Sequence, residues 1–199
     1  MKLNVIKRAK EVLDIEAQAI SSLKNRLGKD FVRAIELILK TKGRVVVSGM
    51  GKTGIIGQKF SATLASTGTP SLFLHTAEAI HGDLGKVTGD DIVVILSNSG
   101  STEEMKQLLP LLKKIGSPII SLTGNAKSIL AKYSDVVLDV SVKKEACPLG
   151  LAPTASTTAT LAMADALAIC LLEQKGFKEK DFAFFHPGGV LGRRLLLKV

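Results

Sequence analysis

Five short apolar runs separated by helix-like segments are the feature that most restricts the fold of this chain. The runs cover residues 44–48, 71–74, 91–96, 118–122 and 135–140. Their near-continuous Val, Ile and Leu content is typical of strands buried on both faces. Helical patterns fill the intervals, at 53–66, 101–115, 126–133 and 155–174. This alternation predicts an α/β fold, a parallel sheet with helices on both faces.

Two helices are expected before the first strand. Residues 5–27 carry apolar side chains at helical spacing, and Asp30 is the expected N-cap of a second helix that ends near Lys40. These helices form an N-terminal extension of about 1–42. At 199 residues with 46% hydrophobic content and no dividing linker, the chain is expected to be one domain, 1–199. Residues 182–199 are Gly-rich and are expected to be irregular.

The formal charge of +9 favours an anionic partner such as a phosphate ester. Nucleic acid is disfavoured, because the chain has no Trp, one Tyr and no long basic run for stacking or backbone binding. No apolar run is expected to reach the length needed to span a bilayer, so no membrane partner is predicted. Cys147 and Cys170 lie in unrelated contexts and do not indicate a disulfide framework. The expected compartment is the cytoplasm.

The turn after the first predicted strand, residues 47–54 (VSGMGKTG), has the form GxGxxG. A dinucleotide site would also need an acidic residue at the end of the second strand, where residues 72–75 read LFLH. A nucleotide P-loop needs a glycine at position 46, which is Val. What remains is a turn whose backbone N–H groups can approach a ligand, with Lys52 beside it. The alternative is an ordinary glycine turn with a solvated lysine.

Residues 96–104 (LSNSGSTEE) follow another buried strand and open a helix. Hydroxyl donors, a glycine turn and a helix N-terminus together suit a phosphate dianion. Ser101 and Glu104 also have the spacing of a capping box, which any helix can use, and both interpretations can hold at once.

Glu145 lies in a Pro-punctuated loop and is a candidate general base, although a Glu after two lysines is also typical of a solvated surface. His81 and His186 lie in loop-like settings where a side chain can reach a ligand, and His75 is expected to be structural. Asp165, within an apolar helical run, is expected to be a buried structural carboxylate. No His or Cys spacing typical of a metal site is present in the sequence, so no metal is predicted.

From about residue 10 to 197 the chain resembles the arabinose-5-phosphate isomerase family of sugar isomerase (SIS) domains. The shared stretches are GMGKTG, STGTP, HGDLG, SNSGSTEE, KEACPLGLAPTASTTATLAMADALA and HPGGVLGRRLL. The resemblance implies a three-layer αβα sandwich around a five-stranded parallel sheet. It also implies a homo-oligomer, a dimer or tetramer, that shares its active sites, and chemistry without a metal or other cofactor.

The same resemblance implies an aldose–ketose isomerase that interconverts D-arabinose 5-phosphate and D-ribulose 5-phosphate through a cis-enediol. The implied catalytic residues are Lys52, Glu104, Glu145 and His186. Glu145 is the expected base and His186 the expected acid/base for ring opening, from a neighbouring subunit. Lys52 would stabilise negative charge and Glu104 would orient or polarise the substrate. The residues expected to bind substrate or phosphate are Ser48, Gly49, Gly51, His81, Ser97, Asn98, Ser99, Gly100 and Thr102.

Two alternatives stay open. The substrate could be a hexulose or heptulose phosphate, because the SNSGST loop would bind the phosphate rather than the carbon chain. The domain could also be a non-catalytic sugar-phosphate sensor. Many family members continue into a pair of nucleotide-sensing CBS modules, and no such module is expected within residues 1–199. The resemblance leaves open whether the chain is a short form or a piece of a longer protein.

Overall fold

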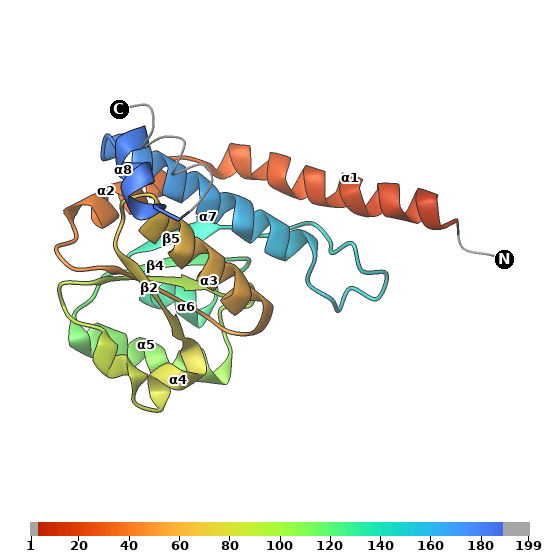
Figure 1. The fold of residues 1–199 in the computed structure, drawn as a ribbon. Coiled ribbons are helices and arrows are strands. Elements are labelled where there is room, and N and C mark those ends of the chain that lie inside the picture. Colours follow the sequence, from red (N-terminus) through yellow and green to blue (C-terminus); the bar gives the residue numbers. More distant parts are fainter. Residues whose placement is uncertain (1–3, 189–199) are drawn as a thin grey trace.

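The computed structural model describes residues 4–188, which form a five-stranded parallel sheet between two helical layers (Figure 1). The strands are β1 (Val45–Gly49), β2 (Ser71–His75), β3 (Ile92–Leu96), β4 (Ile119–Thr123) and β5 (Val136–Asp139). Their order in the sheet is β2-β1-β3-β4-β5, with Val45 in register with Ser71 on one side and Ile92 on the other. The five predicted strands and the three-layer αβα sandwich are confirmed.

Alternate residues of each strand pack against different helical layers, as the period of a strand requires. Val45 and Val47 pack in the layer of α1 (Val5–Leu23), α2 (Lys29–Lys40), α3 (Gly51–Ser66) and α7 (Ala155–Gln174). Val46 packs in the layer of α4 (Thr76–Ile80), α5 (Glu103–Ile115) and α6 (Ile129–Tyr133). Both faces of β1 are therefore buried, which explains its unbroken run of valines.

The structure corrects several predicted helix ends. α2 begins at Lys29 after an N-cap at Gly28, so Asp30 lies in the first turn instead of capping it. α5 begins at Glu103, because residues 97–102 form a loop that turns at Gly100 with φ +62°. Ser101 therefore lies outside the helix and the predicted capping box does not form.

The structure shortens one predicted helix and adds four short ones, α4, α8, η1 and η2. The segment predicted as a helix over 126–133 is shorter, because Ser128 caps α6 by accepting a hydrogen bond from Ala131 N at 3.2 Å. Residues 179–185 form α8 (Glu179–Phe185), so the irregular stretch predicted from 182 begins in a helix. The helix α4 and the 3₁₀ helices η1 (Lys24–Arg26) and η2 (Asp83–Lys86) were not predicted as separate elements.

Within residues 4–188, one helix, α7, is long and apolar enough to cross a membrane by length and composition alone. This corrects the expectation that no apolar run reaches that length. Half of its most apolar 18-residue window is buried, and the helix packs against α1, α2 and α3. The apolar composition of α7 is that of a helix in the middle of a protein core.

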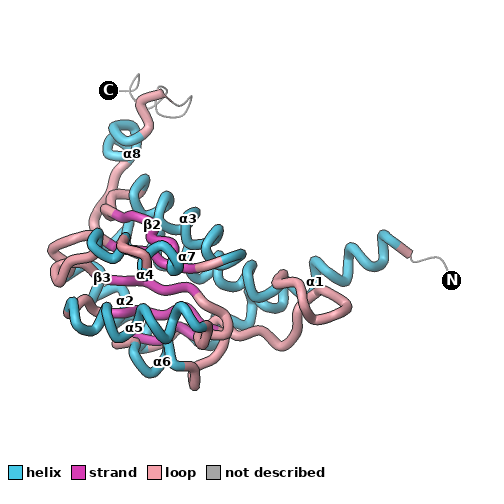
Figure 2. The backbone as a smooth tube through the Cα atoms, turned by 90° about the horizontal axis from the view of Figure 1, so that it is seen from below, coloured by secondary structure: helices cyan, strands magenta, loops and turns pink. Residues whose placement is uncertain are grey.

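α1 extends well beyond the αβα body, and the loop that follows β5 reaches out beside it (Figure 1, where the loop is teal). α8 lies at the opposite end of the molecule in both views (Figures 1 and 2). This separation matters for the site, because Glu145 is in that loop and His186 follows α8.

Candidate active site

The candidate site lies at the carboxyl ends of β1 and β3, the two neighbouring strands between which the strand order reverses. Open α/β sheets bind ligands at this switch point, because the loops that leave the two strands turn to opposite faces. A cleft of about 390 Å³ lies here. Its lining residues are Met50, Lys52, Thr53, Leu96, Ser97, Asn98, Ser99, Thr102, Met105, Glu145, Gly150, Leu151, Pro153 and Ser156.

The turn between β1 and α3 places Lys52 at the cleft. Gly51 has φ +59°, a left-handed conformation that glycine adopts without strain, and α3 begins at this residue. A Cβ on Gly49 would lie 3.1 Å from the carbonyl oxygen of Thr53, so a larger residue there would crowd the start of α3. Lys52 follows in the first turn of α3 and is exposed. Its ammonium group can therefore reach an anion in the cleft.

The loop between β3 and α5 supplies hydroxyl groups to the same cleft. Ser97 is buried, and its Oγ accepts a hydrogen bond from Gly100 N at 3.1 Å, which fixes the turn. Thr102 is the N-cap of α5 but makes no side-chain capping bond, and its buried Oγ1 has no partner among the described residues. A free hydroxyl at the N-terminus of a 13-residue helix suits an anionic ligand.

Glu145 reaches the cleft from the loop after β5. Its Oε2 atom accepts hydrogen bonds from Thr154 N at 2.8 Å, from Thr154 Oγ1 at 2.9 Å and from Ser156 N at 3.3 Å. Burial acts to raise the pKa of Glu145, but the donors of Ser156 and Thr154 outweigh it, so the pKa is lowered. The side chain is therefore a carboxylate at neutral pH, held through one oxygen.

α1 supports the loop that carries Glu145. Arg8 donates a hydrogen bond to the carbonyl oxygen of Ala146, and Arg26 donates one to the carbonyl oxygen of Ser141 at 2.5 Å. Glu16 accepts a hydrogen bond from Thr158 Oγ1 at 2.9 Å, at the start of α7. The Glu145 loop is thus bonded to α1 through Arg8 and to the 3₁₀ helix η1 through Arg26.

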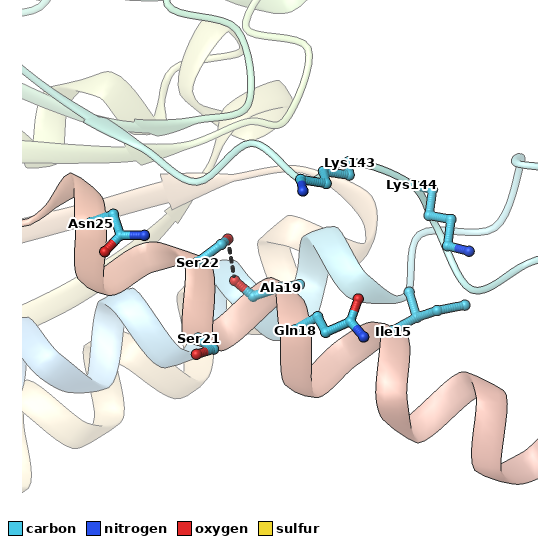
Figure 3. Close-up of a pocket in the computed structure, with 8 residues that line it drawn as sticks. All are labelled: Ile15, Gln18, Ala19, Ser21, Ser22, Asn25, Lys143 and Lys144. Atoms are coloured by element: carbon cyan, nitrogen blue, oxygen red, sulfur yellow. Dashed lines mark hydrogen bonds between the residues drawn. The ribbon is translucent and has the colours of Figure 1, made fainter.

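A larger hollow of about 520 Å³ separates α1 from the same loop, where Gln18 and Ile15 lie opposite Lys143 and Lys144 (Figure 3). None of the candidate catalytic residues lines it. The switch-point cleft is the better candidate despite its smaller volume, because it combines a carboxylate, a lysine and hydroxyl donors.

The other candidate residues lie outside the cleft. Ser48 is fully buried and shares a hydrogen bond of 3.2 Å with Thr76 Oγ1, beneath the turn. Glu104 is half-buried in the first turn of α5, and His81 is exposed at the end of α4, and neither lines the cleft. Gly49, Gly51 and Gly100 shape the two turns without lining the cleft themselves.

His186 is far from the cleft of its own chain. α7 begins beside Glu145 and runs for 20 residues, about 30 Å, before α8 starts. Lys175, just after α7, donates to the carbonyl oxygen of Gly68, which precedes the amino end of β2. His186 stacks on Phe182 with ring centroids 3.8 Å apart, and its Nδ1 lies 2.9 Å from the Phe182 carbonyl oxygen.

Two further predictions concern charges. Asp165 was expected to be buried, but its side chain is 42% exposed and pairs with Lys59, because it lies at the edge of the contact between α7 and α3. Within residues 4–188 no group of three His, Cys, Asp or Glu side chains could hold a metal ion. Chemistry without a metal stays a prediction.

Ser156 is one of the cleft residues that the sequence analysis did not name as a site candidate. It is 2% exposed, lines the cleft, and its amide donates to Glu145. The signal that could have found it is the hydroxyl-rich run at 154–158 at the start of a long apolar helix.

Comparisons with known proteins show what the chain is similar to. Residues 37–170 match the SIS domain. The chain is 61% identical over 197 residues to the arabinose 5-phosphate isomerase KdsD of Pseudomonas aeruginosa, covering 99% of this chain and 60% of the relative. It is 55% identical over 190 residues to KdsD of Escherichia coli K12, covering 96% and 58%. The chain thus spans about three fifths of the length of these curated relatives.

Among solved structures, the chain is similar to Escherichia coli CFT073 c3406 in complex with arabinose 5-phosphate. The two share a TM-score of 0.90 and 43% sequence identity, over 94% of this chain and all of that one. Because the SIS match covers more than half of the sequence, the chain belongs to the SIS domain family.

Proposed function

We propose that this chain is an aldose–ketose isomerase that interconverts D-arabinose 5-phosphate and D-ribulose 5-phosphate through a cis-enediol. The observation that carries the proposal is the single cleft that brings together Glu145, Lys52 and the hydroxyl loop at 97–102. The names of the most similar relatives support the substrate. The cleft volume of about 390 Å³ is adequate for a five-carbon sugar phosphate.

The phosphate would bind to the loop between β3 and α5. Ser97, Ser99 and Thr102 offer hydroxyl donors, and α5 adds the positive end of its dipole. Gly100 permits the turn, and Asn98 lies beside it on the rim of the cleft. In this arrangement the loop would bind the phosphate, and the carbon chain of the sugar would extend toward Glu145.

Glu145 would move the proton between carbons. Its carboxylate takes the proton from C2 of the open-chain aldose, the C2–H electrons form the C1=C2 bond, and the C1 carbonyl becomes an enediolate oxygen. That oxygen is protonated, the C2 hydroxyl loses its proton to become the ketone, and Glu145 returns a proton to C1. Because Oε2 is occupied by three donors, Oε1 is the oxygen available to the substrate.

Lys52 would stabilise the negative charge that develops on the substrate, as an ammonium group at the rim of the cleft. Glu104 would orient or polarise the substrate, and His81 is a further substrate-binding candidate. Because α7 separates His186 from the cleft of its own chain, His186 would complete the site of a neighbouring copy. The proposal therefore includes a homo-oligomer, a dimer or tetramer, with shared active sites.

We further propose that residues 1–199 act as one isomerase domain in the cytoplasm, without a cofactor. The two cysteines, Cys147 and Cys170, are both free thiols, which fits a reducing compartment.

The proposal is tested by incubating the purified protein with D-ribulose 5-phosphate, without added metal and with a chelator, and following arabinose 5-phosphate formation. Glu145→Ala is the test variant. Glu103→Ala is the matched control, because Glu103 is an exposed carboxylate that pairs with Lys106 outside the cleft.

We expect the wild-type protein and Glu103→Ala to form arabinose 5-phosphate. We expect Glu145→Ala to lose this turnover. Turnover of Glu145→Ala within tenfold of wild type would contradict the base assignment. Binding of the sugar phosphate without turnover in the wild type would favour a sensor, and turnover of a hexulose phosphate alone would favour the other substrate class.

A further inference from the structure

The hydroxyl of Ser156 is an unused hydrogen-bond donor at the candidate site. The Ser156 side chain is 2% exposed, and its Oγ has no hydrogen-bond partner among residues 4–188. An unpaired buried hydroxyl destabilises the folded protein and calls for an explanation. Only two such hydroxyls within the described residues line the cleft, and the other is Thr102.

The place of Ser156 differs from that of Thr102. Thr102 belongs to the loop at the N-terminus of α5, where the phosphate would bind, whereas Ser156 lies in the first turn of α7. The backbone N–H of Ser156 donates to Glu145 Oε2, and both residues line the cleft, so Ser156 lies next to the candidate base. The first turn of a 20-residue helix also favours negative charge.

We propose that the Ser156 hydroxyl donates a hydrogen bond to the oxygen that becomes negatively charged in the enediolate, beside Glu145. This inference rests on the proposed isomerase function and extends it by one substrate-binding donor. No proton is transferred from Ser156, because the hydroxyl only stabilises charge that Glu145 creates. A serine hydroxyl can turn about its Cβ to meet an oxygen in the cleft.

A rival role is support of Glu145 alone. The Ser156 side chain is near enough to that carboxylate to favour its ionised form, although it makes no bond of hydrogen-bond geometry to it. The two roles differ in one measurable way. Loss of a donor to the enediolate lowers the rate even where Glu145 is fully ionised. Loss of support for Glu145 alone moves the acid limb of the pH–rate profile to higher pH and leaves the rate above it unchanged.

The test compares Ser156→Ala with Ser121→Ala, and it begins with wild-type turnover. Ser121 is the matched control, because its Oγ is also buried and without a partner, but it lies inside β4 away from the cleft. Both variants should fold as the wild type does, since neither hydroxyl has a bond to lose. The probes are D-ribulose 5-phosphate, inorganic phosphate and 4-phospho-D-erythronohydroxamate, which mimics the enediolate.

We expect Ser156→Ala to lower kcat by about 10²-fold, the typical loss for one oxyanion donor. Its affinity for the hydroxamate should fall similarly, its affinity for inorganic phosphate should stay within twofold of wild type, and the loss of kcat should persist at pH values above the acid limb, where Glu145 is fully ionised. Ser121→Ala should match the wild type throughout.

Three results would overturn the inference. The first is a kcat of Ser156→Ala within threefold of wild type. The second is a loss confined to phosphate affinity, and the third is an acid limb moved to higher pH with the rate restored above it. These leave the isomerase proposal standing, whereas absence of wild-type turnover overturns both proposals together.

Discussion

The two edges of the sheet differ in what their carboxylates contact. At the amino edge, Asp91 precedes β3 and uses both of its oxygens: Oδ1 accepts from Arg44 N at 2.7 Å, and Oδ2 accepts from Thr88 N at 2.8 Å and Thr88 Oγ1 at 2.9 Å. Asp135 precedes β5 and accepts from Ile119 N at 2.8 Å. These carboxylates tie the starts of neighbouring strands together.

At the carboxyl edge, donors and acceptors remain open. Glu145, like Asp135, is bonded through one oxygen, but it lines the cleft, and the hydroxyls of Thr102 and Ser156 beside it have no partner within residues 4–188. A buried polar group without a partner destabilises the folded protein, whereas a fully bonded carboxylate stabilises it. The difference indicates that the amino edge maintains the fold and that the carboxyl edge is arranged for a ligand.

After the loss of turnover in Glu145→Ala, the largest effect should come from Lys52→Ala at the carboxyl edge. Removing the charge that stabilises a developing oxyanion should lower kcat by about 10²–10³-fold, measured by steady-state turnover of ribulose 5-phosphate. Because Lys52 is exposed, the free energy of unfolding should stay within about 0.5 kcal/mol of wild type. Lys59→Ala is the control, a second lysine of α3 that pairs with Asp165 on the surface. Equal activity of the two variants would contradict the prediction.

At the amino edge the effect should be on stability. Asp91→Ala leaves the backbone N–H groups of Arg44 and Thr88 without their acceptor, which should lower the free energy of unfolding by about 3 kcal/mol in urea titration. The folded fraction should keep the wild-type kcat. Asp90→Ala removes an exposed neighbouring carboxylate and should change little. A loss of kcat in fully folded Asp91→Ala would show that the two edges are not separate.

This division was only partly predictable from sequence. The strands could be found because Val45–Val47 and similar runs are buried on both faces and so lack polar interruptions. The turns at 49–54 and 97–102 could be found because glycines and hydroxyls follow buried strands directly. Ser156 was missed because a serine in the first turn of a helix is also typical of ordinary helix starts.

Contacts between distant segments could not be predicted in the same way. Arg8 and Ala146 are 138 residues apart, and Glu16 and Thr158 are 142 apart, so no local pattern joins them. The placement of His186 depends on the length and direction of α7, which only the folded chain shows. Local patterns therefore predict the elements and two of the site's loops, and tertiary packing determines what meets Glu145.

A smaller effect should follow from Thr102→Val, which removes the unpaired hydroxyl but keeps the shape of the side chain. The affinity for inorganic phosphate and for the sugar phosphate should fall about tenfold, the equivalent of one hydrogen bond to a charged group, while kcat stays near wild type. The free energy of unfolding should not fall, because Thr102 makes no capping bond. If Thr102→Val lowered the free energy of unfolding but left the phosphate affinity unchanged, Thr102 would maintain the fold, as Asp91 and Asp135 do, and would not bind the ligand.

The smallest effects should appear on acidification, and they separate the edges by their pH dependence. Burial acts to raise the pKa of Asp135, but the hydrogen bonds from Ile119 and Lys113 outweigh it, so its pKa lies below the ordinary 3.8. The unfolded chain then binds more protons as the pH falls through that region, so the stability from Asp135 is present above pH 3.8 and is lost below it. In Asp135→Asn the free energy of unfolding should therefore fall less steeply as the pH drops. Urea unfolding between about pH 6 and pH 3, roughly the range in which carboxylates titrate, measures this.

The acid limb of activity belongs to Glu145, whose lowered pKa places it below the ordinary 4.5. Asp135→Asn should therefore leave that limb where it is in the wild type. If the substitution moved the activity limb, the amino-edge carboxylate would be coupled to the cleft through the strands, and the distinction between a fold-maintaining edge and a ligand-binding edge would fail.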